Sequence, residues 1–236
     1  MTKLLIQADR KGCPHHFDAA CAMFGAIDQD WSYGLVHYDD LSSDVLTGCV
    51  PVGTVEFMRQ AFAFSGTESP RLPRNSDRIS QEMTLEESLK FRETTGWNIF
   101  IKPKQIKVFT GFVHEGYTYS ALEGVPLDTR VLVYDVFSSP ISSEWRAYVC
   151  AGELLDAKNY AGDFLQIPSK EFIDHVIAKN KSDFPDTYSI DVGILTSGEN
   201  VVIEFNDFWA LGNYGVPNWL YAKALAMRYA SIVSAA

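Results

Sequence analysis

The sequence predicts an α+β protein with an α/β lobe at its N-terminus, and three features predict this class. Short strand-like stretches alternate with amphipathic helical stretches over residues 1–64. A segment of Gly, Ser, Pro, Arg and Asn with few apolar residues then interrupts this alternation between residues 65 and 80. The remainder contains six strand-like stretches and three helical ones, which is typical of a mixed or antiparallel sheet.

Composition limits the classes of function. The chain has 236 residues, 47% of them hydrophobic, which is enough to form a core without disulfide or metal support. Its formal charge of -10 provides no global positive field, so we expect neither nucleic acid nor a membrane surface as partner, and any anionic ligand must be bound locally. Without a signal peptide or a long apolar run, and with four cysteines expected as free thiols, the protein is predicted to be cytoplasmic.

The N-terminal lobe is predicted as a series of short strands and helices. We expect strands at 4–8 and 34–38, and helices at 17–27 and 54–64. Cys13, His15, His16 and Cys21 are residue types that bind zinc, but their spacing fits no paired zinc-ligand pattern, so we interpret them as a loop followed by a helix that buries Cys21. We place the lobe and its linker at 1–85 and a second domain at 86–236.

The second domain is predicted to contain most of the sheet. Helices are expected at 85–93, with Thr84 as a cap, at 169–180 and at 217–233. The strand-like stretches are 98–102, 107–113, 130–137, 145–151, 188–195 and 201–206.

The last two strands are predicted to form a hairpin that gathers oxygen ligands. A two-residue turn at Gly198–Glu199 would place Asp191 directly opposite Asn206, and Glu204 lies two residues before Asn206 on the same face. Two carboxylates and an amide in one patch suit Mg²⁺, which prefers oxygen ligands. A solvated polar face of an edge hairpin is the alternative, and the pattern alone favours neither.

Two further segments offer groups for an anionic ligand. Lys102 ends one predicted strand and Lys107 begins the next. Lysines at strand ends can bind phosphate, but most lysines are ordinary surface residues, so both interpretations stay open. Glu144 and Arg146 share one strand face, either as ribose and phosphate ligands or as an exposed ion pair. Neither common nucleotide-binding glycine motif is present.

In this order the segments resemble the ATP-grasp superfamily. The resemblance is carried by Lys102-Pro103, Phe109-Thr110-Gly111, the strand at 131–137, Glu144-Trp145-Arg146, and Asp191 with Glu204-x-Asn206, followed by an aromatic and Gly-rich tail at 208–215. It is closest to the short phage and bacterial ATP-grasp proteins of the clade named for one arginine and two lysines. It covers residues 90–236 and implies a nucleotide held between two β-rich subdomains.

The resemblance also implies roles for individual residues. ATP would be bound by Lys102 and Lys107 through its phosphates, by the backbone of Tyr134, Asp135 and Val136 at adenine, and by Glu144 at ribose. Arg146, with Lys107, would stabilise the transferred phosphoryl group, and Asp191, Glu204 and Asn206 would bind Mg²⁺. The lead-in arginine of the family would be Arg71, Arg74 or Arg78.

The implied activity is ATP-dependent ligation of a carboxylate to an amine through an acyl phosphate intermediate. The enzyme would catalyse this reaction mainly by positioning the reactants and neutralising their charge. A nucleotide-binding sensor without ligase activity and a phosphotransferase are the alternatives. Small molecules, peptides and protein tails all remain open as substrates, as does the oligomeric state.

Overall fold

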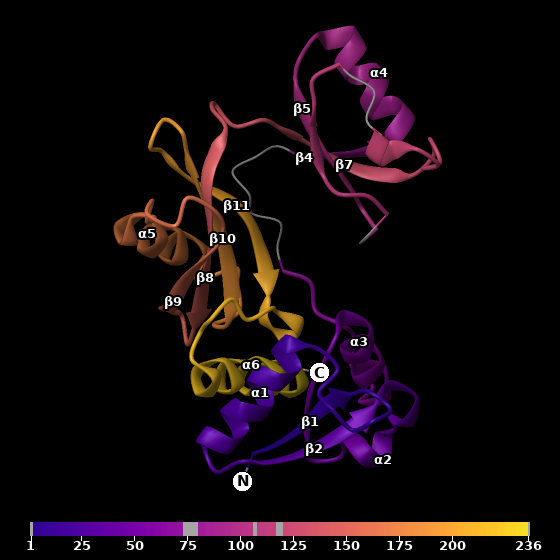
Figure 1. The fold of residues 1–236 in the computed structure, drawn as a ribbon, viewed down its shortest axis with the longest axis vertical. Helices are drawn as coiled ribbons and strands as arrows, with labels where there is room; N and C mark the ends of the chain where they lie inside the picture. The colour runs from indigo at the N-terminus through magenta and orange to yellow at the C-terminus, as the bar shows by residue number, and fades with distance from the viewer. Residues whose placement is uncertain (1, 73–79, 106–107, 117–119, 236) are drawn as a thin grey trace. The chain divides into compact units, whose positions relative to one another are not determined.

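The computed structural model describes residues 2–72, 80–105, 108–116 and 120–235 (Figure 1). The chain forms two compact units. Unit 1 comprises Met1–Asn75, Ser142–Ile194 and Glu199–Ala236, and unit 2 comprises Ser76–Ile141 and Leu195–Gly198. Each is described by itself below, and the division of the chain at residue 85 stays a prediction.

The N-terminal part of unit 1 is a small parallel sheet with helices on both faces. The sheet has the order β2 (Ser32–His37), β1 (Lys3–Ala8), β3 (Val50–Val52). Its helices are α1 (Phe17–Asp28), α2 (Ser43–Leu46) and α3 (Val55–Phe64). The predicted strands and helices of this lobe are confirmed within a few residues, whereas β3 and α2 were not foreseen. Thr54 caps α3 by accepting a hydrogen bond from the backbone N–H of Phe57.

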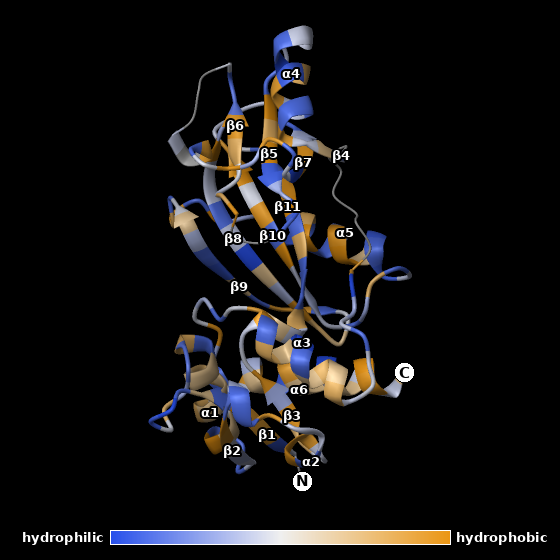
Figure 2. Cartoon of the chain, turned by 90° about the vertical axis from the view of Figure 1, so that its right-hand side faces the viewer, coloured by the Kyte–Doolittle hydropathy of each residue, from blue (hydrophilic) through white to orange (hydrophobic). Residues whose placement is uncertain are grey.

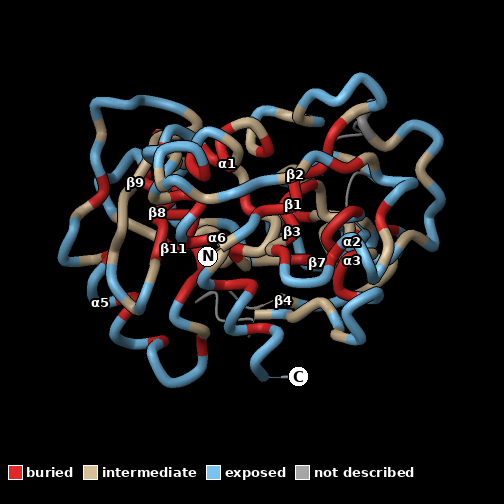
Figure 3. The backbone as a smooth tube through the Cα atoms, turned by 90° about the horizontal axis from the view of Figure 1, so that it is seen from below, coloured by how far each residue is buried: buried red, intermediate tan, exposed pale blue. Residues whose placement is uncertain are grey.

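The C-terminal helix α6 (Asn218–Ser234) packs against α1, so the first and last helices of the chain share a core. Leu4 and Ile6 of β1 face this pair of helices, and Leu5 faces α3 on the other side of the sheet. The approach of α1 to α6 is close, because a Cβ on Gly25 would lie 2.0 Å from the carbonyl oxygen of Asn218. Five of the six residues of β1 are buried (Figure 3).

The second sheet of unit 1 has the order β11 (Asn200–Asp207), β10 (Tyr188–Leu195), β8 (Ile141–Cys150), β9 (Glu153–Gly162). Helix α5 (Lys170–Asn180) covers one face, where Ile173, Val176 and Ile177 pack against Ile190 and Val192. The prediction missed β9, which joins β8 through Ala151 and Gly152. Both turn residues have positive φ, which is the pattern of a type I′ hairpin turn.

The described part of unit 2 contains a four-stranded antiparallel sheet, the helix α4 and a short 3₁₀ helix at Ser120–Leu122. Its order is β4 (Ser80–Thr84), β7 (Arg130–Asp135), β5 (Ile99–Pro103), β6 (Phe112–His114), and α4 is Leu85–Thr95. Thr84 and Glu87 form a capping box at the start of α4, which confirms the predicted cap. In Figure 2 the apolar part of β5 contrasts with the largely hydrophilic α4.

Two predicted strands of unit 2 differ in extent. The strand expected at 107–113 is wrong in its bounds, because the observed β6 has three residues and begins at Phe112. The strand expected at 130–137 ends at Asp135. Across the described residues, no helix combines the length and apolar character needed to cross a membrane.

Candidate functional site

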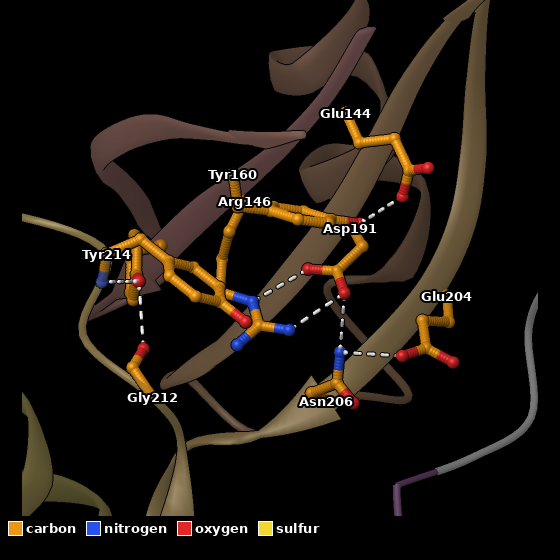
Figure 4. A network of polar contacts seen from close by, with 9 residues as sticks. Glu144, Arg146, Tyr160, Asp191, Glu204, Asn206, Gly212 and Tyr214 are labelled. Carbon is orange, nitrogen blue, oxygen red and sulfur yellow. Dashed lines mark hydrogen bonds and ion pairs between the residues drawn. The ribbon is translucent and has the colours of Figure 1, made fainter. Parts of the chain in front are cut away.

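One face of the second sheet of unit 1 carries a set of polar and charged side chains, which we call the polar face (Figure 4). The opposite face is the apolar core under α5, so the alternation of each strand separates the two. The polar face consists of Glu144 and Arg146 from β8, Lys158 and Tyr160 from β9, Asp191 from β10, and Glu204 and Asn206 from β11.

A buried ion pair lies at the centre of the polar face. Arg146 donates from Nε to Oδ1 of Asp191 and from Nη2 to Oδ2, both over 2.8 Å. The side chains are only 11% and 4% exposed, respectively. Burial raises the pKa of the Asp191 carboxyl, although Arg146 and Asn206 act against it. A carboxylate this far from water needs a cation, and Arg146 provides one.

Glu204 and Asn206 join this pair from β11. The amide nitrogen of Asn206 donates to Oδ2 of Asp191 over 3.1 Å and to Oε1 of Glu204 over 3.4 Å. The predicted convergence of the three side chains is therefore confirmed.

The predicted register of the hairpin is wrong. Asp191 lies opposite Glu204, and Asn206 lies opposite Ser189. Near the turn, Ile194 pairs with Asn200, and a bulge beside Val192 then shifts the register by one residue. Without that shift Asp191 would face Ile203, and Glu204 would point to the other face of the sheet. The bulge thus brings both carboxylates to the polar face.

The donor set fits a hard divalent cation. Asp191 and Glu204 contribute carboxylate oxygens, and an asparagine amide can present an oxygen as well as its NH₂ group. The burial that raises the pKa of Asp191 makes a nearby positive charge favourable. No group of three or more His, Cys, Asp or Glu suited to a metal occurs within the described part of the chain, so Asn206 is essential to this interpretation.

Two tyrosines, Tyr160 and Tyr214, connect Glu144 with Arg146 through a hydrogen bond and ring contacts. The hydroxyl of Tyr160 donates to Oε2 of Glu144 over 2.7 Å. The ring of Tyr160 stacks on that of Tyr214, with ring centroids 5.2 Å apart. The Arg146 guanidinium lies 4.9 Å from the Tyr214 centroid and 5.9 Å from that of Tyr160. Glu144 and Arg146 therefore share a face, as predicted.

Sequence reasoning missed Lys158 and Tyr160 because it missed β9. Lys158 lies directly across from Arg146 in the sheet, and its Nζ is 2.9 Å from Oδ2 of Asp156. The polar face thus has a second cation. The turn at Ala151–Gly152, followed by ten residues without Pro, was the available signal for this strand.

The loop at 211–216 closes one end of the polar face. The hydroxyl of Tyr148 donates to the carbonyl of Gly212 over 2.9 Å and accepts from the backbone N–H of Tyr214 over 3.0 Å. The backbone N–H of Asn213 donates to Oδ1 of Asp18 in α1 over 2.7 Å. This loop therefore links the sheet to the N-terminal lobe within unit 1.

The other predicted nucleotide ligands belong to unit 2. Lys102, predicted to end its strand, is the penultimate residue of β5, which continues to Pro103, and its Nζ lies 5.2 Å from the centroid of the Tyr134 ring. Tyr134 and Asp135 end β7, and Val136 follows the strand and is exposed. Lys107, Arg74 and Arg78 lie outside the described residues.

Comparison with known proteins identifies one sequence family and many similar folds. The family model that matches, over residues 78–224, describes family 2 of the ATP-grasp domains in the clade named for one arginine and two lysines. No curated protein sequence matches the chain.

Three solved structures illustrate the similarity of fold. An ATP-grasp RimK domain protein from Sphaerobacter thermophilus has a TM-score of 0.58 at 11% identity, with 97% of this chain and 99% of that chain covered. The ATP-grasp ligase PsnB, complexed with its precursor peptide PsnA2 and AMPPNP, has a TM-score of 0.57 at 11% identity, with 97% of each chain covered. D-alanine–D-alanine ligase from Bacillus anthracis, complexed with ATP, has a TM-score of 0.53 at 12% identity, with 99% and 98% covered.

Proposed function

The chain belongs to family 2 of this arginine-and-lysine clade of ATP-grasp domains, and from this we propose that it is an Mg²⁺-dependent ligase. The reaction joins a carboxylate to an amine. ATP phosphorylates the carboxylate, ADP leaves, and the amine displaces phosphate from the acyl phosphate. Small-molecule, peptide and protein carboxylates and amines are the substrate classes.

The observation that carries this proposal is the composition of the polar face. A buried carboxylate, Asp191, is held by Arg146 and adjoins Glu204 and Asn206, so that anionic oxygens and a fixed cation occupy one patch. A protein that merely folds gains little from burying such charges, because desolvation offsets much of their attraction. Transfer of a phosphoryl group needs this combination of metal-binding oxygens and a positioned cation.

The side chains take the following roles in this proposal. Asp191, Glu204 and Asn206 hold Mg²⁺, which when bound neutralises phosphate charge. Arg146 stabilises the phosphoryl group during transfer, and Lys158, directly across the sheet, adds positive charge beside it. Glu144 accepts hydrogen bonds from ribose. Lys102 and Lys107 bind ATP phosphates, with Lys107 also acting during transfer, and the backbone at Tyr134, Asp135 and Val136 contacts adenine.

ATP binding tests the nucleotide-site part of this proposal. Lys102→Ala should lose Mg²⁺-dependent ATP binding in isothermal titration calorimetry. Lys104→Ala is the matched control, because Lys104 is two residues away, is exposed and pairs with Glu82 over 2.7 Å. If Lys102→Ala binds ATP as tightly as the Lys104→Ala control, the assignment of Lys102 is wrong.

Product analysis separates the ligase from the two alternatives. ADP release should be stimulated only when a suitable carboxylate and amine are both present, with a new amide bond detected by mass spectrometry. A phosphorylated product that persists in the presence of amines would indicate a phosphotransferase. ATP binding without any stimulated ADP release would favour a sensor.

A further inference from the structure

The outer edge of strand β2 is open in unit 1. β2 pairs with β1 along its full length, from Ser32 to His37, and it is the last strand of its sheet (Figure 1). No other segment within the described ranges pairs with its second side. An edge strand carries a row of N–H and C=O groups that can bind another strand. A further strand can therefore be added to the sheet at β2.

The sequence of β2 lacks the features that usually protect such an edge. Its six residues, SYGLVH, include no Asp, Glu, Lys, Arg or Pro. Proteins commonly protect an edge strand with a charge or a proline, or by keeping the strand very short. The opposite edge of the same sheet follows this rule, because β3 has only three residues and the middle one is Pro51.

The edge strands of the other two sheets are protected as well. β9 contains Asp156 and Lys158, and β11 contains Glu204. β4 contains Glu82, and β6 has only three residues. Among the edge strands that the structure describes, β2 alone is longer than three residues and has neither a proline nor an acidic residue, lysine or arginine. This contrast indicates that β2 is suited to pairing.

The exposed side chains of β2 include two large apolar ones. Tyr33 and Leu35 lie opposite Leu4 and Ile6 of β1, and so they point to the same face of the sheet. Leu4 and Ile6 pack against α1 and α6 on that face. Because β2 is at the edge, Tyr33 and Leu35 remain 40% and 39% exposed there.

Helix α1 adds two exposed apolar side chains on this face of the sheet. Phe24 and Ile27 are both 49% exposed, and a spacing of three residues places them on one side of the helix. They lie near the end of α1, which contacts β2, and only three residues separate the helix from the strand. We call Phe24, Ile27, Tyr33 and Leu35 the edge patch. Exposed apolar patches of this kind mark sites of protein association.

We propose that the chain forms a two-fold symmetric dimer in which β2 pairs antiparallel with β2 of a second copy. The two three-stranded sheets then join into one sheet of six strands. The two-fold axis is perpendicular to this sheet, so the edge patches of both copies meet on the same face. The occupant is a second copy because a two-fold contact pairs a surface with itself, and β2 is the unprotected edge that the chain offers.

The charge of the protein agrees with a contact through β2. Each copy has a formal charge of -10, so two copies repel unless they meet where acidic side chains are few. β2 brings no carboxylate into the interface, and the main-chain hydrogen bonds of an added strand require none. The proposal is independent of the ligase function, because no residue of the edge patch belongs to the polar face.

Sedimentation velocity of the full chain tests the association. At micromolar concentrations the protein should sediment as a species of twice the chain mass of 26.4 kDa. The combined variant Tyr33→Lys and Leu35→Lys brings four lysines together in the dimer, and like charges in an interface cost several kcal/mol. The dissociation constant of this lysine variant should therefore rise about a hundredfold or more.

The combined variant Val45→Lys and Phe64→Lys is the matched control. These side chains are 39% and 40% exposed, and they lie on α2 and α3, which pack on the other face of the sheet. The control should remain dimeric. A wild-type protein that is monomeric at every concentration, a lysine variant that remains dimeric, or equal weakening in the two variants would overturn the proposal.

Hydrogen exchange distinguishes strand pairing from a contact through α1 alone. The outward-facing backbone amides of residues 32–37 should exchange about tenfold more slowly, or slower still, in the dimer than in the lysine variant, while the amides of α5 should not differ. Dilution of the wild-type protein below its dissociation constant should remove this protection, so the test holds even if the lysine variant fails to fold. Equal exchange at 32–37 in dimer and monomer would exclude the pairing of β2.

Discussion

The pair formed by Arg146 and Asp191 gives a prediction that links stability to metal binding. Arg146→Met removes the cation but keeps much of the side-chain volume, and so leaves a carboxylate that is 4% exposed without a counter-charge. Breaking a buried pair in this way costs about 3–5 kcal/mol. We therefore expect the free energy of unfolding, measured by urea denaturation without divalent cations, to fall by about that amount.

Mg²⁺ should restore part of this loss if Asp191, Glu204 and Asn206 form the metal site. A ligand stabilises the folded state in proportion to the logarithm of its concentration over Kd, which gives about 1.4 kcal/mol when free Mg²⁺ is tenfold above Kd. Losing Arg146 leaves Oδ1 of Asp191 without its donor and Oδ2 with only the amide of Asn206, so the carboxylate becomes more available to a cation. The increment from Mg²⁺ should therefore be larger in Arg146→Met than in the wild-type protein.

Unit 1 contains a matched control. Arg228 donates from Nε and Nη2 to the two carboxylate oxygens of Asp207, over 2.7 and 2.6 Å, and these side chains are 8% and 9% exposed. Arg228→Met should lose a similar free energy of unfolding, but its response to Mg²⁺ should equal that of the wild-type protein. Equal Mg²⁺ increments in the two variants, or none in Arg146→Met, would refute the metal site on the polar face.

Three further predictions concern other parts of the fold. Gly25→Ala should destabilise the protein by about 3 kcal/mol in thermal unfolding, because its Cβ would collide with the backbone of Asn218, whereas Gly34→Ala, with an ordinary contact at 3.6 Å, should have little effect. Thr84→Ala removes one half of a capping box and should lower the free energy of unfolding by about 1 kcal/mol in urea, and no change would mean that the box does not stabilise α4. Burial lowers the pKa of His114, so protonation favours the unfolded state, and stability should fall as pH decreases below about 6.5. His114→Phe should flatten the dependence of the free energy of unfolding on pH. An unchanged dependence in this variant would contradict the role assigned to His114.

Local patterns in the sequence account for much of the fold. The strand predicted at 188–195 has the observed bounds of β10, and α5 was expected within one residue of its observed start. The cap at Thr84 was also foreseen, because the side chain that caps the helix is adjacent to it in sequence. These features depend on residues within a few positions of one another.

β9 was missed because its residues are poor indicators of a strand. Asp156, Lys158 and Asn159 have low strand propensity, and the strand forms because β8 pairs with it through a tight turn. Lys158 and Tyr160 were lost from the predicted site with it. Packing against a neighbouring strand decided this element.

For the candidate site, the sequence by itself determined which residue types are present and which strands carry them: Arg146 on one strand, Asp191 on another, and Glu204 and Asn206 on a third. Only the tertiary structure decided that Arg146 pairs with Asp191 and that Asp18 lies near Gly212. It also decided that a bulge beside Val192 places the side chains of Asp191 and Glu204 on the same face of the hairpin. The physical reason is distance along the chain. Helix caps and strand periodicity arise from neighbouring residues, whereas pairing register and the meeting of α1 with the loop at 211–216 depend on contacts between distant segments.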